Sequence, residues 1–495
     1  MKDALYIAVD LGAGSGRVML GGMAPGELRL DEVRRFTYPM EKRDGHLRWP
    51  FAHILSEIDH GLGQAVVAAK ELGRTIRSVG VDTWGVDYGF VNSDGVLLED
   101  PITYRDDRTA TEMAAVFERM PKDQVFARTG IQFLVFNSLF QLHAHRHTGL
   151  PVGADRLMMI ADLVHHHLCG KVAIEYSNAT TMQLVNAKTG DWDADLLRLL
   201  DLPAGILPDI VAAGSDLGVV SPDLANKLGL QGVRVVAPAT HDTGSAVVGA
   251  PLQDGWAYIS SGTWSLVGVE RSNTLVNAEV AKENFTNEGG AFGTIRFLKN
   301  VMGLWLLESC RKEWQAQNRD VAYSTLLEQV NAMPVAGPVV CPDDQRFFNP
   351  TSMLAALSEQ LGESGQAVPT EPAAITKIIL DSLALRYARV VQIIERLTGQ
   401  TIQGVQIVGG GCQNDYLNQA TADASGKPVL AGPVEATAGG NLMVQAIAAG
   451  RFASLDEARV HVRGVVSLRR FEANPARFSQ TTRDQYLALE CRVLA

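Results

Sequence analysis

Asp242, near the middle of the chain, is a candidate general base. It follows the short apolar run Val235–Ala239 and stands between His241 and Thr243. Small polar neighbours leave room for a ligand, and a carboxylate at the end of a buried strand could accept the proton of a bound hydroxyl group. Asp and Thr also precede helices as caps, because their oxygens accept free backbone N–H groups. On this stretch alone, helix capping is the favoured interpretation of Asp242.

A glycine-rich turn near the N-terminus is a candidate phosphate-binding loop. The strand-like run Leu5–Val9 ends at Asp10, and glycines separate it from the run Arg17–Leu20. The second run is too short for a helix and the chain has no Gly-Lys-Ser/Thr here, so the pattern indicates a β-hairpin rather than a dinucleotide fingerprint or a P-loop. Backbone N–H groups at the hairpin tip can bind phosphate, with Ser15 and Arg17 as further donors. An ordinary tight hairpin is the alternative.

The same pattern recurs in the second half of the chain. The strand-like runs Trp256–Ser260 and Ser265–Val269 flank the small polar turn Ser261–Thr263. Two such hairpins, one at the start of each half, predict a duplicated fold in which each lobe supplies a phosphate loop.

Two further places could contact a ligand. The buried run Gly404–Val408 leads into three glycines, Gly409–Gly411, where a nucleobase or ribose could lie against the backbone. A tight strand-to-helix turn is the alternative. Asn300 lies in a segment, Phe297–Leu307, that is expected to open a helix, so it could cap that helix or reach a ligand.

Two acids and a tryptophan form a candidate polyol site. Asp82, Trp84 and Asp87 lie in the segment Arg77–Val91, which indicates two strands broken at residues 83–85. Carboxylates can accept hydrogen bonds from sugar hydroxyls, and an indole face can stack on a sugar. The alternative is that both acids face solvent and that Trp84 is packed, and the residues leave the two interpretations open.

Several histidines cluster between residues 143 and 167. His143 and His147 have the i, i+4 spacing that places two side chains on one helix face. A zinc site would need further ligands at suitable positions, and the chain has no His-Glu-x-x-His. We therefore expect these histidines, with His145 and the run His165–His167, on helix surfaces.

The elements that must position these residues belong to a large α/β protein. At 495 residues the chain is expected to form two domains or more. Helices are expected at about Ile54–Leu72, Pro372–Leu397 and Asn414–Ala424. The second of these has Pro372 in its first turn and Gly399 just past its end.

Composition excludes several classes of protein. A net charge of −11 argues against nucleic acid or anionic membranes as main partners, and no apolar run is long enough to span a bilayer. The chain has five cysteines, an odd number, and they are far apart in the sequence. This pattern argues against both a disulfide scaffold and a zinc ribbon. The N-terminus does not resemble a signal peptide, so we expect a reduced, cytoplasmic location.

These segments together resemble the FGGY family of carbohydrate kinases, within the actin–sugar kinase–Hsp70 superfamily. No single motif is specific, but their order and spacing are. The matching segments are residues 9–13, 81–87, 104–106, 136–139, 176–181, 241–243, 260–266, 286–290, 298–305, 408–414 and 431–437.

The resemblance implies a fold and an activity. The fold would be a two-lobed, actin-like ATPase fold of the α/β class with ribonuclease H-like, duplicated domains and a central cleft. We expect residues 1–246 to form a sugar-binding lobe and residues 247–495 a nucleotide-binding lobe. The motifs at residues 81–87 and 241–243 point, within the family, to phosphorylation of L-rhamnulose at its 1-hydroxyl group with ATP and Mg²⁺.

The resemblance also implies roles for particular residues. Asp242 would be the catalytic base, and Asp10 is the candidate for holding Mg²⁺. The residues implied in sugar binding, together with the candidate polyol site, are Gly85, His241, Asp242, Thr243, Asn300, Asp82, Trp84 and Asp87. Those implied in ATP binding are Ala13, Gly14, Ser15, Gly16, Arg17, Thr263, Glu308 and Gly410. Glu308 stands where the family pattern has a nucleotide-contacting Gln.

Two rival interpretations lead to different assays. A kinase for another sugar, such as L-fuculose, D-xylulose or glycerol, would share the fold and base but differ around Asp82–Asp87 and Asn300. An actin- or Hsp70-like ATPase would turn over ATP without a sugar, and the polar–aromatic cluster at residues 82–88 argues against it. A monomer or a homodimer is expected.

Overall fold

The computed structural model describes residues 4–319, 321–333, 337–474 and 476–494. The described chain divides into two compact units. The first unit contains Met1–Pro251, Glu270–Phe297 and Ala436–Val466, and the second contains Leu252–Val269, Leu298–Glu435 and Ser467–Ala495. The chain thus returns to the first unit after building most of the second.

A mixed sheet forms the centre of the first unit. Its strands run in the order β11-β12-β6-β1-β2-β3. The sheet consists of β1 (Ala4–Leu11), β2 (Ser15–Gly22), β3 (Arg29–Thr37), β6 (Thr75–Thr83), β11 (Asp216–Val219) and β12 (Arg234–Val236). β1 pairs antiparallel with β2 and parallel with β6, which in turn pairs parallel with β12. The hairpin predicted at the N-terminus is therefore confirmed.

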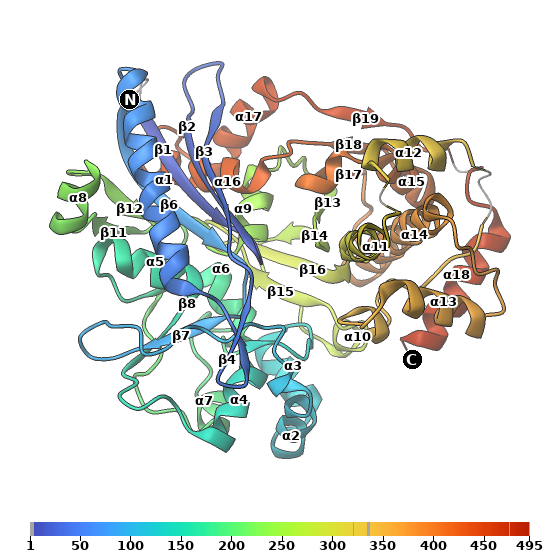
Figure 1. Ribbon diagram of the computed structural model, residues 1–495, viewed down its shortest axis with the longest axis horizontal. Helices are drawn as coiled ribbons and strands as arrows, with labels where there is room; N and C mark the ends of the chain where they lie inside the picture. Colours follow the sequence, from blue (N-terminus) through green and yellow to red (C-terminus); the bar gives the residue numbers. More distant parts are fainter. Residues whose placement is uncertain (1–3, 320, 334–336, 475, 495) are drawn as a thin grey trace. The chain divides into compact units, whose positions relative to one another are not determined.

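Helices cover both faces of this sheet. Because successive side chains of a strand point to opposite faces, neighbouring residues of β2 contact different helices. Val18 lies against Gly61 of α1 (Phe51–Glu71), whereas Met19, one residue on, belongs to the core around α16 (Ala436–Ala448). Figure 1 shows α16, at the red end of the colour range, near the blue strand β1, with which it is in contact.

α16 also packs closely on α9 (Asp242–Gly249). A Cβ added at Gly440 would lie 1.8 Å from the carbonyl oxygen of Ser245, and one at Gly249 would lie 2.1 Å from that of Ala436. Only glycine permits this approach of two helix backbones.

The remaining elements of the first unit lie outside this sheet. They are β4 (Glu41–Arg43), β5 (His46–Arg48), β7 (Tyr88–Val91), β8 (Arg156–Met159), β9 (Ile174–Glu175), β10 (Ile210–Val211), β15 (Thr286–Gly289), α2 (Glu112–Arg119), α3 (Lys122–Thr129), α4 (Ser138–Thr148), α5 (Ile160–Cys169), α6 (Tyr176–Ala179), α7 (Ala194–Leu199), α8 (Pro222–Leu228), α10 (Ala278–Lys282) and α17 (Leu455–Val465). β7 pairs antiparallel with β8 in a separate small sheet.

The histidines were expected on helix surfaces, and for part of the group this is wrong. His143, His145 and His165 are buried, whereas the side chain of His147 is exposed. α4 and α5 are buried over most of their circumference, so the spacing of polar residues alone could not indicate which histidines face the interior.

The second unit is built on a sheet with the same connections. The strands of this sheet that belong to the second unit run in the order β16-β14-β13-β17-β18-β19. β13 (Trp256–Ser261) pairs antiparallel with β14 (Trp264–Arg271) and parallel with β17 (Gly404–Val408). The sheet is completed by β16 (Ile295–Met302, of which residues 298–302 belong to this unit), β18 (Val429–Ala431) and β19 (Arg469–Phe471). The second hairpin and the duplication are thus confirmed.

Helices account for the rest of the second unit. They are α11 (Trp305–Ala316), α12 (Tyr323–Asn331), α13 (Met353–Glu363), α14 (Pro372–Thr398), α15 (Asp415–Ser425) and α18 (Gln480–Val493). α14 and α15 confirm two predicted helices, and α1 confirms a third. The expectation that Asn300 opens a helix is wrong, because Asn300 lies within β16 and α11 begins at Trp305. Among the described residues, no helix combines the length and the apolar character that a bilayer span requires.

The contact between α9 and α16 yields a test of packing. We expect Gly440→Ala to lower the free energy of unfolding by about 1–3 kcal/mol or more, because the new Cβ meets backbone that cannot move aside. Gly439→Ala is the matched control: its Cβ would lie 3.9 Å from the nearest side chain, so this change should be neutral or stabilising by up to about 1 kcal/mol. Thermal unfolding of both variants measures the difference, and equal loss in the two would contradict the packing argument.

Candidate active site

The sheet register of the first unit places three of the predicted residues side by side. Asp10 on β1 is the direct partner of Arg17 on β2 and of Asp82 on β6. Arg17 forms an ion pair with Asp10. Parallel strands deliver Asp10 and Asp82 to the same edge of the sheet, so two carboxylates share a small volume with a guanidinium group.

Asp82 is fully buried and carries the most perturbed carboxyl group of this cluster. One oxygen accepts a hydrogen bond from Asn441 Nδ2 at 2.6 Å, whereas no described residue donates to Asp82 Oδ1. Burial, and after it the negative charge of Asp10, raise the pKa of Asp82 well above its usual value, while the Asn441 hydrogen bond lowers it. The alternative that Asp82 faces solvent is wrong.

Asp242 is the first residue of α9, and 31% of its side-chain surface stays exposed. Its carboxylate accepts hydrogen bonds from the backbone N–H and the hydroxyl group of the adjacent Thr243. Helix capping in the usual sense does not occur, because the N-cap residue is His241 and its side chain makes no cap hydrogen bond. The surrounding protein raises the pKa of Asp242 by desolvation; His241 lowers it and the charge of Asp10 raises it.

A buried glutamate holds the loop before Asp242. Glu175 Oε2 accepts hydrogen bonds from both the N–H and the hydroxyl group of Thr240, each at 2.9 Å, and from the N–H and hydroxyl group of Ser177. Ser177 Oγ in turn accepts from the His241 N–H at 3.1 Å. Glu175 thus fixes the backbone that leads into α9.

The His241 ring lies between Asp242 and a buried ion pair. Arg296 Nη2 donates to His241 Nδ1 at 3.0 Å and lies 3.2 Å from Glu288 Oε2. Because guanidinium groups only donate, this contact favours the tautomer with the proton on Nε2, whereas Glu288 Oε2, 3.3 Å from the same Nδ1, favours a proton on Nδ1. His241 Nε2 lies 3.5 Å from Asp242 Oδ1, so the ring can present that proton toward the base.

Asp87 supports the aromatic residues of the candidate polyol site. Its Oδ2 accepts hydrogen bonds from Trp49 Nε1 at 2.7 Å and Trp84 Nε1 at 2.9 Å, and its Oδ1 accepts from Gln141 at 3.2 Å. Burial raises the pKa of Asp87 to about 6, although these hydrogen bonds lower it. Asp87 does not face solvent, and Trp84 is packed, with only 6% of its surface exposed.

The backbone between Trp84 and Asp87 is strained. Val86 has φ of 66°, a left-handed conformation that is costly for a β-branched residue. Its N–H donates to Thr181 Oγ1 at 3.0 Å, and its carbonyl accepts from Ser138. A Cβ added at the neighbouring Gly85 would lie 2.9 Å from Thr181 Oγ1, so this position has no room for a side chain.

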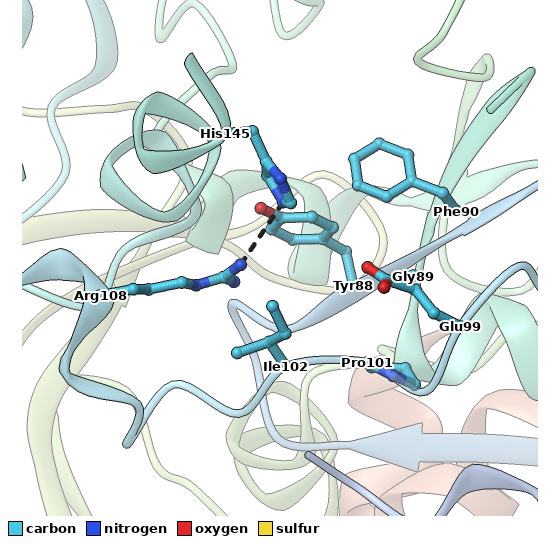
Figure 2. Close-up of a pocket in the computed structure, with 8 residues that line it drawn as sticks. All are labelled: Tyr88, Gly89, Phe90, Glu99, Pro101, Ile102, Arg108 and His145. Atoms are coloured by element: carbon cyan, nitrogen blue, oxygen red, sulfur yellow. Dashed lines mark hydrogen bonds between the residues drawn. The ribbon is translucent and has the colours of Figure 1, made fainter. Parts of the chain in front are cut away.

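A small pocket lies behind this segment, lined by residues that include Tyr88, Phe90, Arg108 and His145 (Figure 2). Figure 2 shows the Arg108 guanidinium group pointing toward His145, at 3.4 Å. Arg108 also donates to Gln141 at 2.7 Å, which connects the pocket to Asp87. Burial, followed by the charge of Arg108, lowers the pKa of His145 to about 4.

The N-terminal hairpin tip exposes some residues and packs others. Ala13 and Ser15 are exposed, and Gly14 has φ of 140° with open space at its Cβ position. Gly16 is packed, because a Cβ there would lie 2.6 Å from Phe36. The Tyr38 hydroxyl group lies 2.9 Å from the Ser15 carbonyl oxygen and also contacts that of Gly12, which steadies the tip.

The second unit carries its own hairpin tip. Thr263 is exposed, and its carbonyl oxygen accepts hydrogen bonds from the N–H groups of Gly303 at 3.1 Å and Trp305 at 3.2 Å. Gly262 N–H bonds the Trp264 carbonyl at 2.9 Å, as Gly12 N–H bonds that of Ser15 at 2.9 Å in the first unit. Asn300, on β16, is partly buried.

The three consecutive glycines have different roles. Gly409 has φ of 82°, and a Cβ at Gly411 would lie 2.0 Å from Ser261 Oγ. Gly410 is exposed with open space around it, so a flat ligand can approach its backbone. The tight-turn alternative explains Gly409 and Gly411 but not Gly410. Glu308, on α11, is half exposed and forms an ion pair with Arg311 at 3.0 Å.

The structure thus assembles Asp10, Arg17, Asp82, His241 and Asp242 within the first unit, while Thr263, Asn300, Glu308 and Gly410 belong to the second. Sequence reasoning assigned no role to four residues that support the first group: Glu175, Glu288, Arg296 and Asn441. Glu288 lies in the recognised segment 286–290, Glu175 directly precedes the segment 176–181, and Asn441 lies four residues after the segment 431–437. The signal in the sequence that could have indicated such supporting residues was an acid or an amide among small residues.

The family follows from comparison with known proteins. Residues 5–249 match the N-terminal domain and residues 257–449 the C-terminal domain of the FGGY family of carbohydrate kinases. The chain belongs to this family.

Proteins named rhamnulokinase are among its relatives. The chain is 42% identical to one from Bacteroides thetaiotaomicron, over 90% of this chain and 91% of the relative. It is 38% identical to one from Bacillus subtilis, over 94% of this chain and 95% of the relative.

Solved structures of sugar kinases share the fold. A ligand-bound xylulose kinase from Lactobacillus acidophilus has a TM-score of 0.81 at 14% identity, covering 99% of this chain and 97% of that one. A glycerol kinase from Plasmodium falciparum with ADP has a TM-score of 0.79 at 14% identity, covering 99% and 98%. The predicted α/β, actin-like ATPase fold is confirmed.

The hydrogen bond to Asp82 yields a pH-dependent prediction. Asn441→Ala should lower the free energy of unfolding at neutral pH by about 1–3 kcal/mol, because a buried carboxylate loses its donor. The pKa of Asp82 is already raised in the native state and should rise further, so protons bind the native protein more tightly than the unfolded chain. The loss should therefore shrink as the pH falls.

Asn418→Ala is the matched control. Asn418 is equally buried, but its Nδ2 donates to the carbonyl oxygen of Cys412, which does not titrate. Its destabilisation should be independent of pH. Urea unfolding of both variants at several pH values measures the effect, and parallel pH profiles would contradict the proposed coupling to Asp82.

Proposed function

We propose that this chain transfers the γ-phosphoryl group of ATP to the 1-hydroxyl group of L-rhamnulose. The observation that carries the proposal is the 38–42% identity to proteins named rhamnulokinase, over at least 90% of the chain. The first unit brings together Asp10, Asp82 and Asp242, and this cluster of acids supports the proposal because such a transfer needs a proton acceptor and a metal ion.

Asp242 is the proposed general base. Its carboxylate is partly exposed, so a hydroxyl group can reach it, and its raised pKa strengthens it as a proton acceptor. The sugar oxygen attacks the γ-phosphate as Asp242 takes its proton. His241, held by Arg296, presents Nε2–H beside the base and can orient the same hydroxyl group.

The remaining predicted sugar contacts divide into two kinds. Gly85, Thr243 and Asn300 are proposed to line the sugar. Asp87 is proposed to act indirectly, because its oxygens already accept from Trp49, Trp84, Tyr104 and Gln141; it keeps the indole rings in place.

The nucleotide is proposed to contact both hairpin tips and the glycine turn. Ala13–Arg17 and Thr263 would bind the phosphates through backbone N–H groups and short side chains. Gly410 offers open backbone to the adenine, and Glu308 lies on α11 of the same unit. In this proposal residues 1–246 form the sugar-binding lobe and residues 247–495 the nucleotide-binding lobe.

Mg²⁺ fits the acids of the first unit. Asp10 and Asp82 are adjacent carboxylates, and the buried Asp82 Oδ1 has no hydrogen-bond donor among the described residues. Hard oxygen ligands are those that Mg²⁺ prefers. Asp10 is the proposed ligand, directly or through water, with Asp82 beside it. When bound, Mg²⁺ would neutralise charge on the transferring phosphate. A cytoplasmic monomer or homodimer is proposed.

Substrate preference tests the proposal directly. In a coupled assay of ADP release, kcat/KM should be highest for L-rhamnulose among L-rhamnulose, L-fuculose, D-xylulose, L-ribulose and glycerol. A preference for another sugar would overturn the substrate and leave a carbohydrate kinase. ATP turnover that does not depend on any sugar would overturn the kinase activity and favour an actin- or Hsp70-like ATPase.

Replacement of the base separates chemistry from binding. Asp242→Asn should lower kcat by about 10² or more while the affinity for sugar, measured by calorimetry, changes little, because proton transfer is lost but the shape is kept. Asp254→Asn, which alters an exposed acid in the turn before β13, is the control and should behave as the parent does. Near-normal turnover of Asp242→Asn would refute the base assignment.

A further inference from the structure

A buried glutamate on α2, among residues that have no role in the proposed active site, has two histidines as its side-chain neighbours. Glu112 is the first residue of α2, and 4% of its surface is exposed. A buried carboxylate is costly unless it is paired or binds a metal ion. Among the described residues, no lysine or arginine forms an ion pair with Glu112. Its oxygens face His143 and His147 instead.

The two histidines come from one face of α4. Their i, i+4 spacing places the rings on successive turns, with centroids 6.3 Å apart. Glu112 Oε2 lies 2.6 Å from His143 Nδ1, and Glu112 Oε1 lies 3.3 Å from His147 Nε2. One possible ligand atom from each of the three residues lies within 4.8 Å of the others. Glu112 is thus a candidate for the third ligand that the histidine spacing lacked.

We propose that Glu112, His143 and His147 form a binding site for a borderline divalent transition-metal ion, with Zn²⁺ as the reference. Two imidazoles and one carboxylate are a common zinc ligand set, and tetrahedral zinc then keeps a fourth position for water. The side chain of His147 is 66% exposed, so the ion can enter from solvent and retain that water. Mg²⁺ prefers oxygen ligands and would not compete effectively here.

The distances between Glu112 and the two histidines can be compared with the ligand separations of a tetrahedral zinc site. Metal–ligand bonds of about 2.0–2.2 Å in a tetrahedron place ligand atoms roughly 3.3 Å apart. The contact of His147 with Glu112, at 3.3 Å, already has this separation. His143 Nδ1 contacts the other carboxylate oxygen, Glu112 Oε2, in a hydrogen bond of 2.6 Å, so metal binding must replace the proton of this hydrogen bond. The bound ion would then join α2 to α4.

Direct metal binding to the full-length, untagged chain tests this site. After treatment with a chelator and its removal, Zn²⁺ binding is measured by competition with a chromophoric chelator. We expect one Zn²⁺ per chain, and Co²⁺ in its place should give the intense visible absorption of a tetrahedral site. Loss of a ligand should weaken binding by at least about 100-fold, more than the 10–100-fold typical of losing an outer partner of a ligand.

Three variants make the test decisive. His147→Ala changes an exposed side chain and should fold normally, and Glu112→Gln keeps the shape of the buried side chain; both should lose the tight Zn²⁺ ion. His60→Ala, which removes an exposed histidine on α1, should retain it. Phosphoryl transfer by His147→Ala should equal that of the parent, since the residue is outside the proposed active site.

Other outcomes would overturn the proposal. Parent protein without a stoichiometric Zn²⁺ ion, or His147→Ala and His60→Ala binding equally tightly, would leave the cluster as a hydrogen-bonded contact between α2 and α4.

Discussion

Repulsion among neighbouring carboxylates is the constraint on which the first unit depends. Asp10 and Asp82 are adjacent because β1 and β6 pair in parallel register, and the bridge between Thr83 and His241 brings the start of α9 beside them. The charge of Asp10 raises the pKa of both Asp82 and Asp242. Arg17 and Asn441 offset part of this cost. A metal–nucleotide complex would offset more, so the arrangement favours binding a cation.

Two further buried acids make this arrangement rigid. Glu175 holds the loop that precedes Asp242, and Asp87 holds two indole rings through one oxygen atom. Burial raises the pKa of each, which means that each destabilises the folded protein at neutral pH relative to an exposed acid. The left-handed backbone at Val86 also destabilises the folded protein. Such costs concentrate where geometry matters for binding.

Much of the fold could be predicted from the order of short segments. Both hairpins, the helices α1, α14 and α15, and the duplication follow from apolar runs and their glycine or proline boundaries, which are local properties. The prediction for Asn300 was wrong because the apolar run at residues 297–307 has no clear period, so strand and helix could not be distinguished. The burial of His143, His145 and His165 was missed for a different reason: α4 and α5 are buried over most of their circumference, so the spacing of polar residues did not mark an exposed face.

The sequence by itself determined the kind of chemistry: an acid before a helix, glycine hairpins in each half, and motifs in an order that identifies the family. Only the tertiary structure decided which residues support that chemistry. Asp82 and Asp87 were alike in sequence, yet one is buried beside Asp10 and the other beneath Trp49 and Trp84. Asn441 and Glu112 acquire partners from distant parts of the chain, at Asp82 and at His143. Pairing over such separations depends on strand register and helix packing, which no local pattern encodes.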